Sequence, residues 1–226
     1  MQWLIDFWQS LTPSIKSTII ITFVLLILIV ILRIMMRNYD STRPAHGIIL
    51  FVEKFFKLMN DFSREMMGKR WKIFAPYFIT LSVFLFTANI SGLFGLTPPT
   101  TSLTVTGTLA IITFLMIQIF GIISTGPKQY LKDICSPIPM TPMNIIGEIA
   151  FPLSLMFRLF GNILSGAILT TLVYSFFGWF SLIITPELHL IFDIGFGLIQ
   201  TLVFVILSAV FIANKFSENE FEMENN

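Results

Sequence analysis

An arginine stands in an apolar stretch in the last third of the sequence. Arg158 is the only basic residue between Lys132 and Lys215, and most residues from 151 to 160 are apolar. An arginine at the centre of a membrane costs about 2.5–3.5 kcal/mol on the insertion scale, so it is expected to face protein or water. We therefore predict a functional cation at membrane depth. The alternative is a structural arginine that is ion-paired or reaches the membrane surface.

Polar residues accompany this arginine at helical spacing, because positions four apart share one side of a helix. The two stripes so formed are Ser154, Arg158, Asn162 and Gly166 on one helix, and His189, Asp193, Gly197 and Gln200 on the next. Glu148 lies ten positions before Arg158, about 80° away around an ideal helix, so it need not share the arginine's face. Acids and a cation at membrane depth are what an ion pathway requires.

The few other reactive side chains predict no metal centre and no bound cofactor. The chain has two histidines and one cysteine, and it lacks a nucleotide-binding loop, a zinc-binding His and Glu pattern and a Gly-x-Ser-x-Gly turn. We expect His46 to be a surface residue and Cys135 to have no specific role. His189 either lines the ion path or is an interfacial residue near the outer face.

The composition excludes an ordinary soluble domain. Of 226 residues, 55% are hydrophobic and 12% are charged, and the mean hydropathy is +0.83. Soluble domains carry roughly 25% charged residues. The single cysteine also excludes a disulfide scaffold. A membrane protein with several spans is the class that remains.

The charges are distributed as a membrane topology signal and not as a nucleic-acid-binding surface. Nine of the fourteen Lys and Arg residues fall between Arg33 and Lys72. Lys16 alone precedes the first apolar run and three arginines follow it, so the positive-inside rule places the N-terminus outside and the C-terminus in the cytoplasm. We expect a multi-pass protein of a cell membrane with no nucleic-acid partner.

We predict an all-α polytopic membrane protein that forms a single integral domain over residues 1–226. The runs long enough to span a bilayer are 14–36, 73–97, 102–124, 143–177 and 185–216. Residues 44–68 have the apolar spacing of an amphipathic helix on the cytoplasmic surface, the alternative being a helix packed on a partner protein. The acidic end, 217–226, is expected to be solvated.

The last two predicted helices are longer than a membrane is thick. Residues 145–177 would reach about 50 Å as a helix and 185–216 about 45 Å, against a hydrocarbon core of about 30 Å. Either Pro152 breaks the first helix, or both are strongly tilted. Thr185-Pro186-Glu187 has the residue types of a helix start, so the second of these helices is expected to begin there. We predict that the two helices form a tilted hairpin with its turn at 178–179.

Three segments carry a resemblance to a known family. Residues 152–162 (PLSLMFRLFGN) resemble the signature of subunit a of F-type ATP synthases. Residues 197–204 (GLIQTLVF) look like the final-helix motif of that family, and 89–95 followed by 98–101 look like its second-span and loop pattern. The resemblance covers roughly residues 45–214, and the RLFGN element in this context is highly specific. The sequence is therefore identified as a member of this family.

The resemblance implies a stator subunit that conducts ions through two offset half-channels against a rotating ring of c subunits. The other partners that it implies are b-type peripheral stalk subunits, the F1 sector indirectly, and the lipid bilayer. Such a subunit is no enzyme by itself but an ion-translocating component of the ATP synthase. Arg158 matches the essential ring-facing arginine, and Gln200 matches its partner on the last helix. Asn162 and Ser154 match polar positions along the ring-facing helix.

The access channel that the family implies is less fully matched. Asp193 lies where members carry His, Glu or Asp in one access channel, and Glu148 lies in the region that supplies acids to that pathway. Ala167 departs from the pattern, because this position is often acidic or His in the family. Asp193 is therefore expected to carry the proton relay without a nearby partner.

Two other classes of protein remain open from the residues alone. A small secondary ion transporter would also place a few charges near the midplane, but the chain is short and has no visible internal repeat. An intramembrane enzyme would use Asp193 and Glu148 as general acid and base, and no motif supports it. Whether the ion is H⁺ or Na⁺ depends largely on the ring. The short tails and the basic segment favour a bacterial plasma membrane over a mitochondrial inner membrane.

Overall fold

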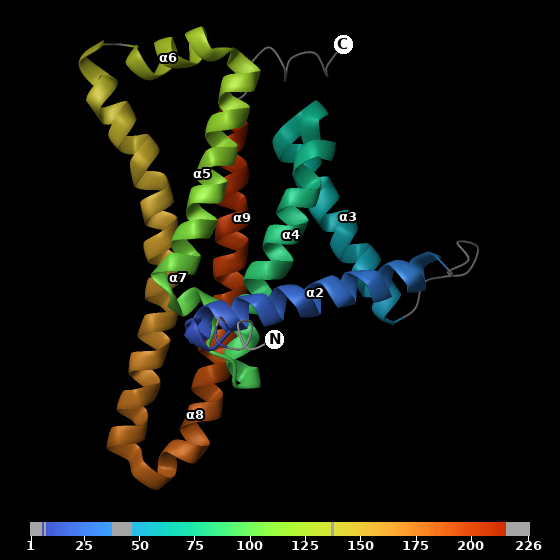
Figure 1. Cartoon of the computed structure of the whole chain (residues 1–226), viewed down its shortest axis with the longest axis vertical. Coiled ribbons are helices and arrows are strands. Elements are labelled where there is room, and N and C mark those ends of the chain that lie inside the picture. The colour runs from blue at the N-terminus through green and yellow to red at the C-terminus, as the bar shows by residue number, and fades with distance from the viewer. Residues whose placement is uncertain (1–5, 7, 38–46, 137, 216–226) are drawn as a thin grey trace.

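The computed structural model describes residues 6, 8–37, 47–136 and 138–215. These residues form helices joined by short turns, and they contain no β-strand. Five helical stretches are long and apolar enough to cross a membrane. The predicted all-α membrane fold is therefore confirmed, in the arrangement of Figure 1. The acidic tail at 217–226 and His46 lie outside the described residues.

Helix α2 (Pro13–Arg37) crosses the other helices in Figure 1 instead of running alongside them. Ser17 and Ile21 in its first half are buried. The Ser17 hydroxyl lies 3.5 Å from the Thr97 hydroxyl, which ties α2 to a distant loop. Many of the apolar side chains that follow are exposed, so the rest of α2 offers an apolar surface to lipid or to another protein.

Helices α3 (Ile48–Met67) and α4 (Trp71–Ile90) form a hairpin through the 3₁₀ turn η1 (Gly68–Arg70). The rings of Phe62 and Phe78 meet edge to face with centroids 6.0 Å apart. The charged residues of α3 are all exposed. The second half of this amphipathic helix therefore packs its apolar side on α4 and turns its charged side away.

Two 3₁₀ turns, η2 (Ser91–Phe94) and η3 (Pro99–Thr101), end the α3–α4 hairpin and lead into helix α5 (Leu103–Thr125). Prolines and hydroxyl residues interrupt the long uncharged stretch here, as the sequence indicates. The Thr101 hydroxyl and the Thr101 backbone N–H both donate to the Pro98 carbonyl, at 2.7 and 3.0 Å. The loop is therefore tightly folded between two long helices.

A short helix, α6 (Pro127–Cys135), and a 3₁₀ turn, η4 (Ile138–Met140), connect the third and fourth predicted spans. Gly126 ends α5 with φ of 82°, a conformation that favours glycine. Pro127 then stands at the first position of α6, where its missing N–H costs nothing. These two residues explain why α5 ends and a new helix begins at once.

Helix α7 (Thr141–Phe177) is continuous over 37 residues, so Pro152 does not break it. A proline removes one backbone hydrogen bond, which neighbouring helices and local adjustments can compensate in membrane proteins. In Figure 1 α7 descends from α6 along the whole molecule to the turn η5 (Gly178–Phe180). Trp179 and Phe180 at this turn are strongly exposed, as aromatic residues are at membrane interfaces.

The return helix, α8 (Ser181–His189), begins four residues before the start that its residue types suggested. The Ser181 hydroxyl donates to the Gly178 carbonyl at 2.5 Å, so the turn leads directly into the helix. Thr185 is therefore buried inside α8 and does not cap it, and Pro186 lies in the helix interior. The position of the η5 turn therefore determines where α8 begins, and the N-cap residue types at 185–187 do not.

The chain continues from α8 through a seven-residue π-helix, η6 (Leu190–Phe196), into α9 (Gly197–Ala213). Figure 1 shows α9 beside α4 and α5. The rings of Phe151 on α7 and Phe211 on α9 lie 3.8 Å apart by their centroids. The fully buried side chains that join these helices are Phe74, Phe78, Leu85, Ile117, Leu155, Leu159, Phe204 and Ile212.

Candidate functional site

A cavity of about 450 Å³ lies between the α4–α5 loop, α7, η6 and the start of α9. Three of the residues that the sequence singled out, Asn162, Asp193 and Gln200, line it together. Its other polar or small lining residues include Asn89, Gly92, Thr97, Thr101, Gly166, Ala167, Thr170 and Gly197. A space of this size lined by amide, hydroxyl and carboxylate groups can hold water, since water needs polar partners.

Asn162 and Gln200, both lining this cavity, link α7 to α9. The Asn162 Nδ2 atom donates to Gln200 Oε1 at 2.9 Å. Gln200 is only 4% exposed, and its Nε2 atom has no hydrogen-bond partner in the part of the chain that the structure describes. A buried donor of this kind is costly unless satisfied, so the amide is suited to hydrogen-bond water in the cavity.

Asp193 is the carboxylate of this cavity and belongs to the π-helix η6. A side chain at Gly92 would meet the Asp193 Oδ2 atom at 3.4 Å, so the carboxylate reaches the 3₁₀ turn η2. A π-helix inside an α-helical segment is rare and is often found at functional sites. Ala167 also lines the cavity and offers no ionisable group there.

A buried hydrogen-bond network holds α9 against α4 beside the cavity. Asn89, which is 4% exposed, donates from Nδ2 to the Gly197 carbonyl at 3.3 Å. The fully buried Thr100 donates to Asn89 Oδ1 at 3.2 Å. Thr201 donates to the same Gly197 carbonyl at 2.8 Å. This hydrogen-bond network thus fixes the point at which η6 becomes α9, between Asp193 and Gln200.

Replacing Gly197 with alanine is expected to destabilise the protein, because an added Cβ would lie 2.9 Å from the Cβ of Asn89. Neither atom can rotate away, so α4 and α9 must separate, and such overpacking costs about 1–3 kcal/mol. Thermal unfolding of the purified protein in detergent measures the effect. Gly147→Ala is the matched control, since no atom lies within 4 Å of its added Cβ. Equal midpoints for the two variants would contradict the tight packing.

Arg158 is not among the residues that line the cavity, and it lies on a part of α7 that the rest of the chain covers only partly. The arginine is half-buried and precedes Asn162 by one helical turn, and Ser154 is exposed one turn earlier. Phe157 beside it is 58% exposed. Arg158 pairs with no acidic side chain in the part of the chain that the structure describes. Among the described residues, no acid of the same chain therefore neutralises its guanidinium.

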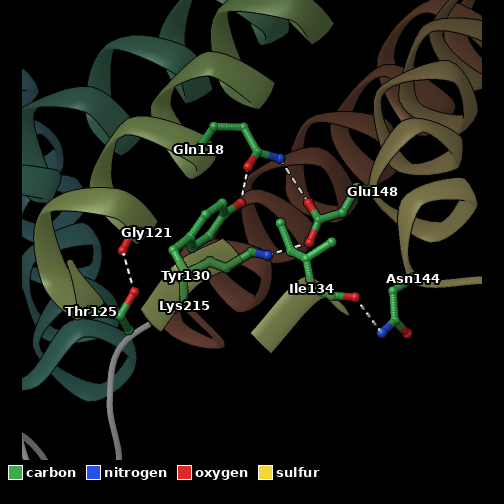
Figure 2. Close-up of polar contacts among 8 residues, drawn as sticks. All are labelled: Gln118, Gly121, Thr125, Tyr130, Ile134, Asn144, Glu148 and Lys215. Carbon is green, nitrogen blue, oxygen red and sulfur yellow. Dashed lines mark hydrogen bonds and ion pairs between the residues drawn. The ribbon is translucent and has the colours of Figure 1, made fainter. Parts of the chain in front are cut away.

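The remaining two predicted site residues are not among the residues that line the cavity. Glu148 lies near the start of α7 and contacts Lys215 and Gln118, as Figure 2 shows. His189 is the last residue of α8, immediately before η6, and its side chain is outside the described part. The predicted set of residues is thus divided between the cavity, a partly exposed face of α7 and a separate polar cluster.

Sequence reasoning gave no role to Asn89, Gly92 or Thr100. The structure places Gly92 beside Asp193 and Asn89 beside Gly197, and Thr100 donates to Asn89. The only signal was their position in the pattern at 89–95 and 98–101. None of them is charged, and Asn89 and Gly92 meet Gly197 and Asp193 from about a hundred residues away in the chain. Periodicity within one helix carries no information about such contacts.

Comparison with known proteins gives one consistent family. The sequence model described as ATP synthase A chain matches residues 18–213. ATP synthase subunit a of Mycoplasma pneumoniae is 32% identical over 89% of this chain and 78% of the relative. ATP synthase subunit a of Moorella thermoacetica is 31% identical over 88% and 90%, and ATP synthase subunit a 1 of Crocosphaera subtropica is 32% identical over 93% and 91%. The chain belongs to the ATP synthase A chain family.

Proposed function

We propose that this chain is the stator subunit a of an F-type ATP synthase and conducts ions through two offset half-channels against a rotating ring of c subunits. Two neighbouring features of α7 together support the proposal. Asn162 lines a polar cavity with Asp193 and Gln200, and Arg158 stands one turn away on a partly exposed face. The chain is then no enzyme by itself but couples ion flow to ATP synthesis.

Arg158 has the properties that the ring interface requires. A guanidinium is effectively never deprotonated in a protein, so its charge persists even when water is excluded. A fixed cation attracts each carboxylate of the passing ring, favours its ionised form and so promotes release of its ion. The same charge repels a free cation, which prevents a direct leak between the half-channels. Exposed Ser154 and Phe157 leave room for a ring helix on this face.

Asp193 is the proposed relay of one half-channel. A carboxylate passes protons between water and an acceptor when both remain hydrated, and the cavity supplies the space and polar partners for water. Gln200 and Asn162 line the route from Asp193 toward Arg158. The membrane potential contributes about 2.3 kcal/mol per elementary charge per 100 mV, so a water path that bypassed the ring would dissipate it.

The proposed orientation places the N-terminus outside and the C-terminus in the cytoplasm of a bacterium. In Figure 1 the α3–α4 turn and α6 lie at the same end of the molecule. Both are basic, with Lys69 and Arg70 at the turn and Lys128 and Lys132 in α6, as the positive-inside rule requires for the cytoplasmic side. The further proposed partners are b-type stalk subunits, and through them the F1 sector, together with the surrounding lipid.

Purification of the tagged chain from its own membranes tests this proposal. We expect a ring of small hairpin subunits and a soluble ATPase sector to co-purify, and vesicles containing the complex to take up ions when ATP is added. Stimulation by Na⁺ would identify sodium as the ion, and acidification independent of Na⁺ would identify the proton. Ion transport by the chain alone, with no ring or ATPase sector, would instead support a small secondary ion transporter.

A further inference from the structure

A second polar cluster lies at the opposite end of α7 from the η5 turn. Helix α7 diverges from α5 toward this end, and α6 connects the two, as Figure 1 shows. Side chains from four segments meet across the divergence in Figure 2: Gln118 of α5, Tyr130 of α6, Glu148 of α7 and Lys215 after α9. The cluster shares no residue with the cavity around Asp193.

The Glu148 carboxylate is the centre of this cluster, and both of its oxygens are engaged. Its Oε1 atom forms an ion pair with Lys215 Nζ, and its Oε2 atom accepts a hydrogen bond from Gln118 Nε2 at 2.7 Å. Gln118 in turn accepts a hydrogen bond from the Tyr130 hydroxyl. The side chains of Lys215 and Glu148 are 18% and 26% exposed, so the pair is largely removed from water.

The surroundings of the pair hold its members in place. The Lys215 ammonium lies 5.0 Å from the centroid of the Tyr130 ring, a cation–π distance. A Cβ added at Gly121 would lie 2.9 Å from the Tyr130 ring, so α5 has room there only for glycine. Burial raises the pKa of the Tyr130 phenol, and its hydroxyl therefore remains a hydrogen-bond donor to Gln118.

Arg158 lies between two points at which α7 is joined to the α9 segment. Glu148 precedes it by about 15 Å along the helix, and Asn162 follows it by about 6 Å. Asn162 bonds Gln200, and the Phe151 ring packs on α9 one turn after Glu148. The Glu148 contact is the outermost of these contacts between α7 and the α9 segment, because it lies nearest the end at which α7 diverges from α5.

We propose that Glu148 and Lys215 form an ion-pair clamp, oriented by Gln118 and Tyr130, that fixes the start of α7 and thereby positions Arg158 against the ring. This inference rests on the proposed function. Glu148 is in this account a positioning residue and carries no ions, although the family resemblance implied that it belongs to the pathway. Both of its carboxylate oxygens are already engaged, one by a lysine and one by an amide.

The test compares Glu148→Gln, Lys215→Met, the double variant with both changes, and the exchange Glu148→Lys with Lys215→Glu. ATP-driven ion uptake and ATP hydrolysis are measured in inverted vesicles and normalised to the assembled complex. We expect both single variants to lower the ions moved per ATP by similar factors of about five, the double variant to add little, and the exchange to recover most of the loss. Lys215→Arg should retain coupling. Glu65→Gln and Lys57→Met, both exposed on α3, are the matched controls.

Two results would overturn the clamp and leave the proposed function standing. Glu148→Gln could abolish ion uptake while Lys215→Met has no effect and the exchange fails, in which case Glu148 carries ions. Alternatively, all clamp variants could couple as well as the α3 controls, in which case the ion pair is dispensable. Reduced assembly at unchanged ions per ATP would also contradict a positioning role. Failure of the unaltered complex to pump would refute the proposed function instead.

Discussion

Arg158→Lys is expected to lower ATP synthesis driven by an imposed ion gradient by about 10- to 100-fold. The estimate follows from one lost charge-assisted hydrogen bond, worth about 1.5–3 kcal/mol, at the step where a ring carboxylate passes. Lysine keeps a positive charge in water, but its ammonium neutralises readily when desolvated and lacks the planar fork of the guanidinium. Arg158 has no acidic partner among the described residues of its own chain, so little in this subunit would keep a lysine charged.

The matched control for this prediction is Arg33→Lys on the exposed surface of α2. It makes the same chemical change in the same chain, and we expect synthesis at the level of the unaltered protein. Both variants must assemble to the same extent, judged by the amount of each subunit in washed membranes. Full synthesis by an assembled Arg158→Lys complex would show that the particular chemistry of arginine is not needed at this position.

Asp193→Asn is expected to lower passive proton flow through membranes stripped of the ATPase sector by at least about tenfold. Loss of a general acid or base typically lowers a rate by about 10²-fold at the low end, so the expected minimum lies below that figure. Asparagine keeps the size and polarity of the side chain but cannot release a proton. The cavity provides no other carboxylate among its lining residues, because Ala167 stands on the facing part of α7. Water alone then carries the protons, which explains why the expected loss is smaller than for a complete block.

Asp61→Asn on the exposed face of α3 is the control for this second change. Asp193→Glu serves as the conservative variant and should restore part of the flow, since it again supplies a carboxylate to the same cavity. Proton flow that is unchanged in Asp193→Asn vesicles would mean that the relay runs through water without this residue. The cavity would then be a solvent path rather than a proton-transfer site.

Much of the fold was accessible from the sequence because membrane helices are set by local composition. A bilayer selects apolar runs of about 20 residues, and prolines and hydroxyl residues mark the breaks between them. The break between the predicted spans 73–97 and 102–124 and the turn at 178–179 both followed from such local signals, and the structure has 3₁₀ turns at both places. The stripes identified Asn162 and Gln200 as polar residues of two successive helices, and the structure joins their amides by a hydrogen bond that the spacing did not predict.

The contacts between distant segments were not accessible in the same way. Glu148 meets Lys215, 67 residues further along the chain, and Asn89 meets Gly197 across 108 residues. The π-helix around Asp193 and the early start of α8 depend on how the turn and the neighbouring helices pack, which no local propensity encodes. Sequence spacing therefore identified the ionisable residues but not the groups that hold them.

The most direct test of the stator account is ATP-driven acidification of inverted membrane vesicles that carry the unaltered chain or Arg158→Ala. Assembly is checked by blotting for each subunit, and the experiment is run with and without Na⁺. The account predicts that an assembled Arg158→Ala complex hydrolyses ATP but moves no ions into the vesicles. Acidification at the unaltered rate by that complex would contradict the assignment of Arg158 to the ring interface, and with it the central claim.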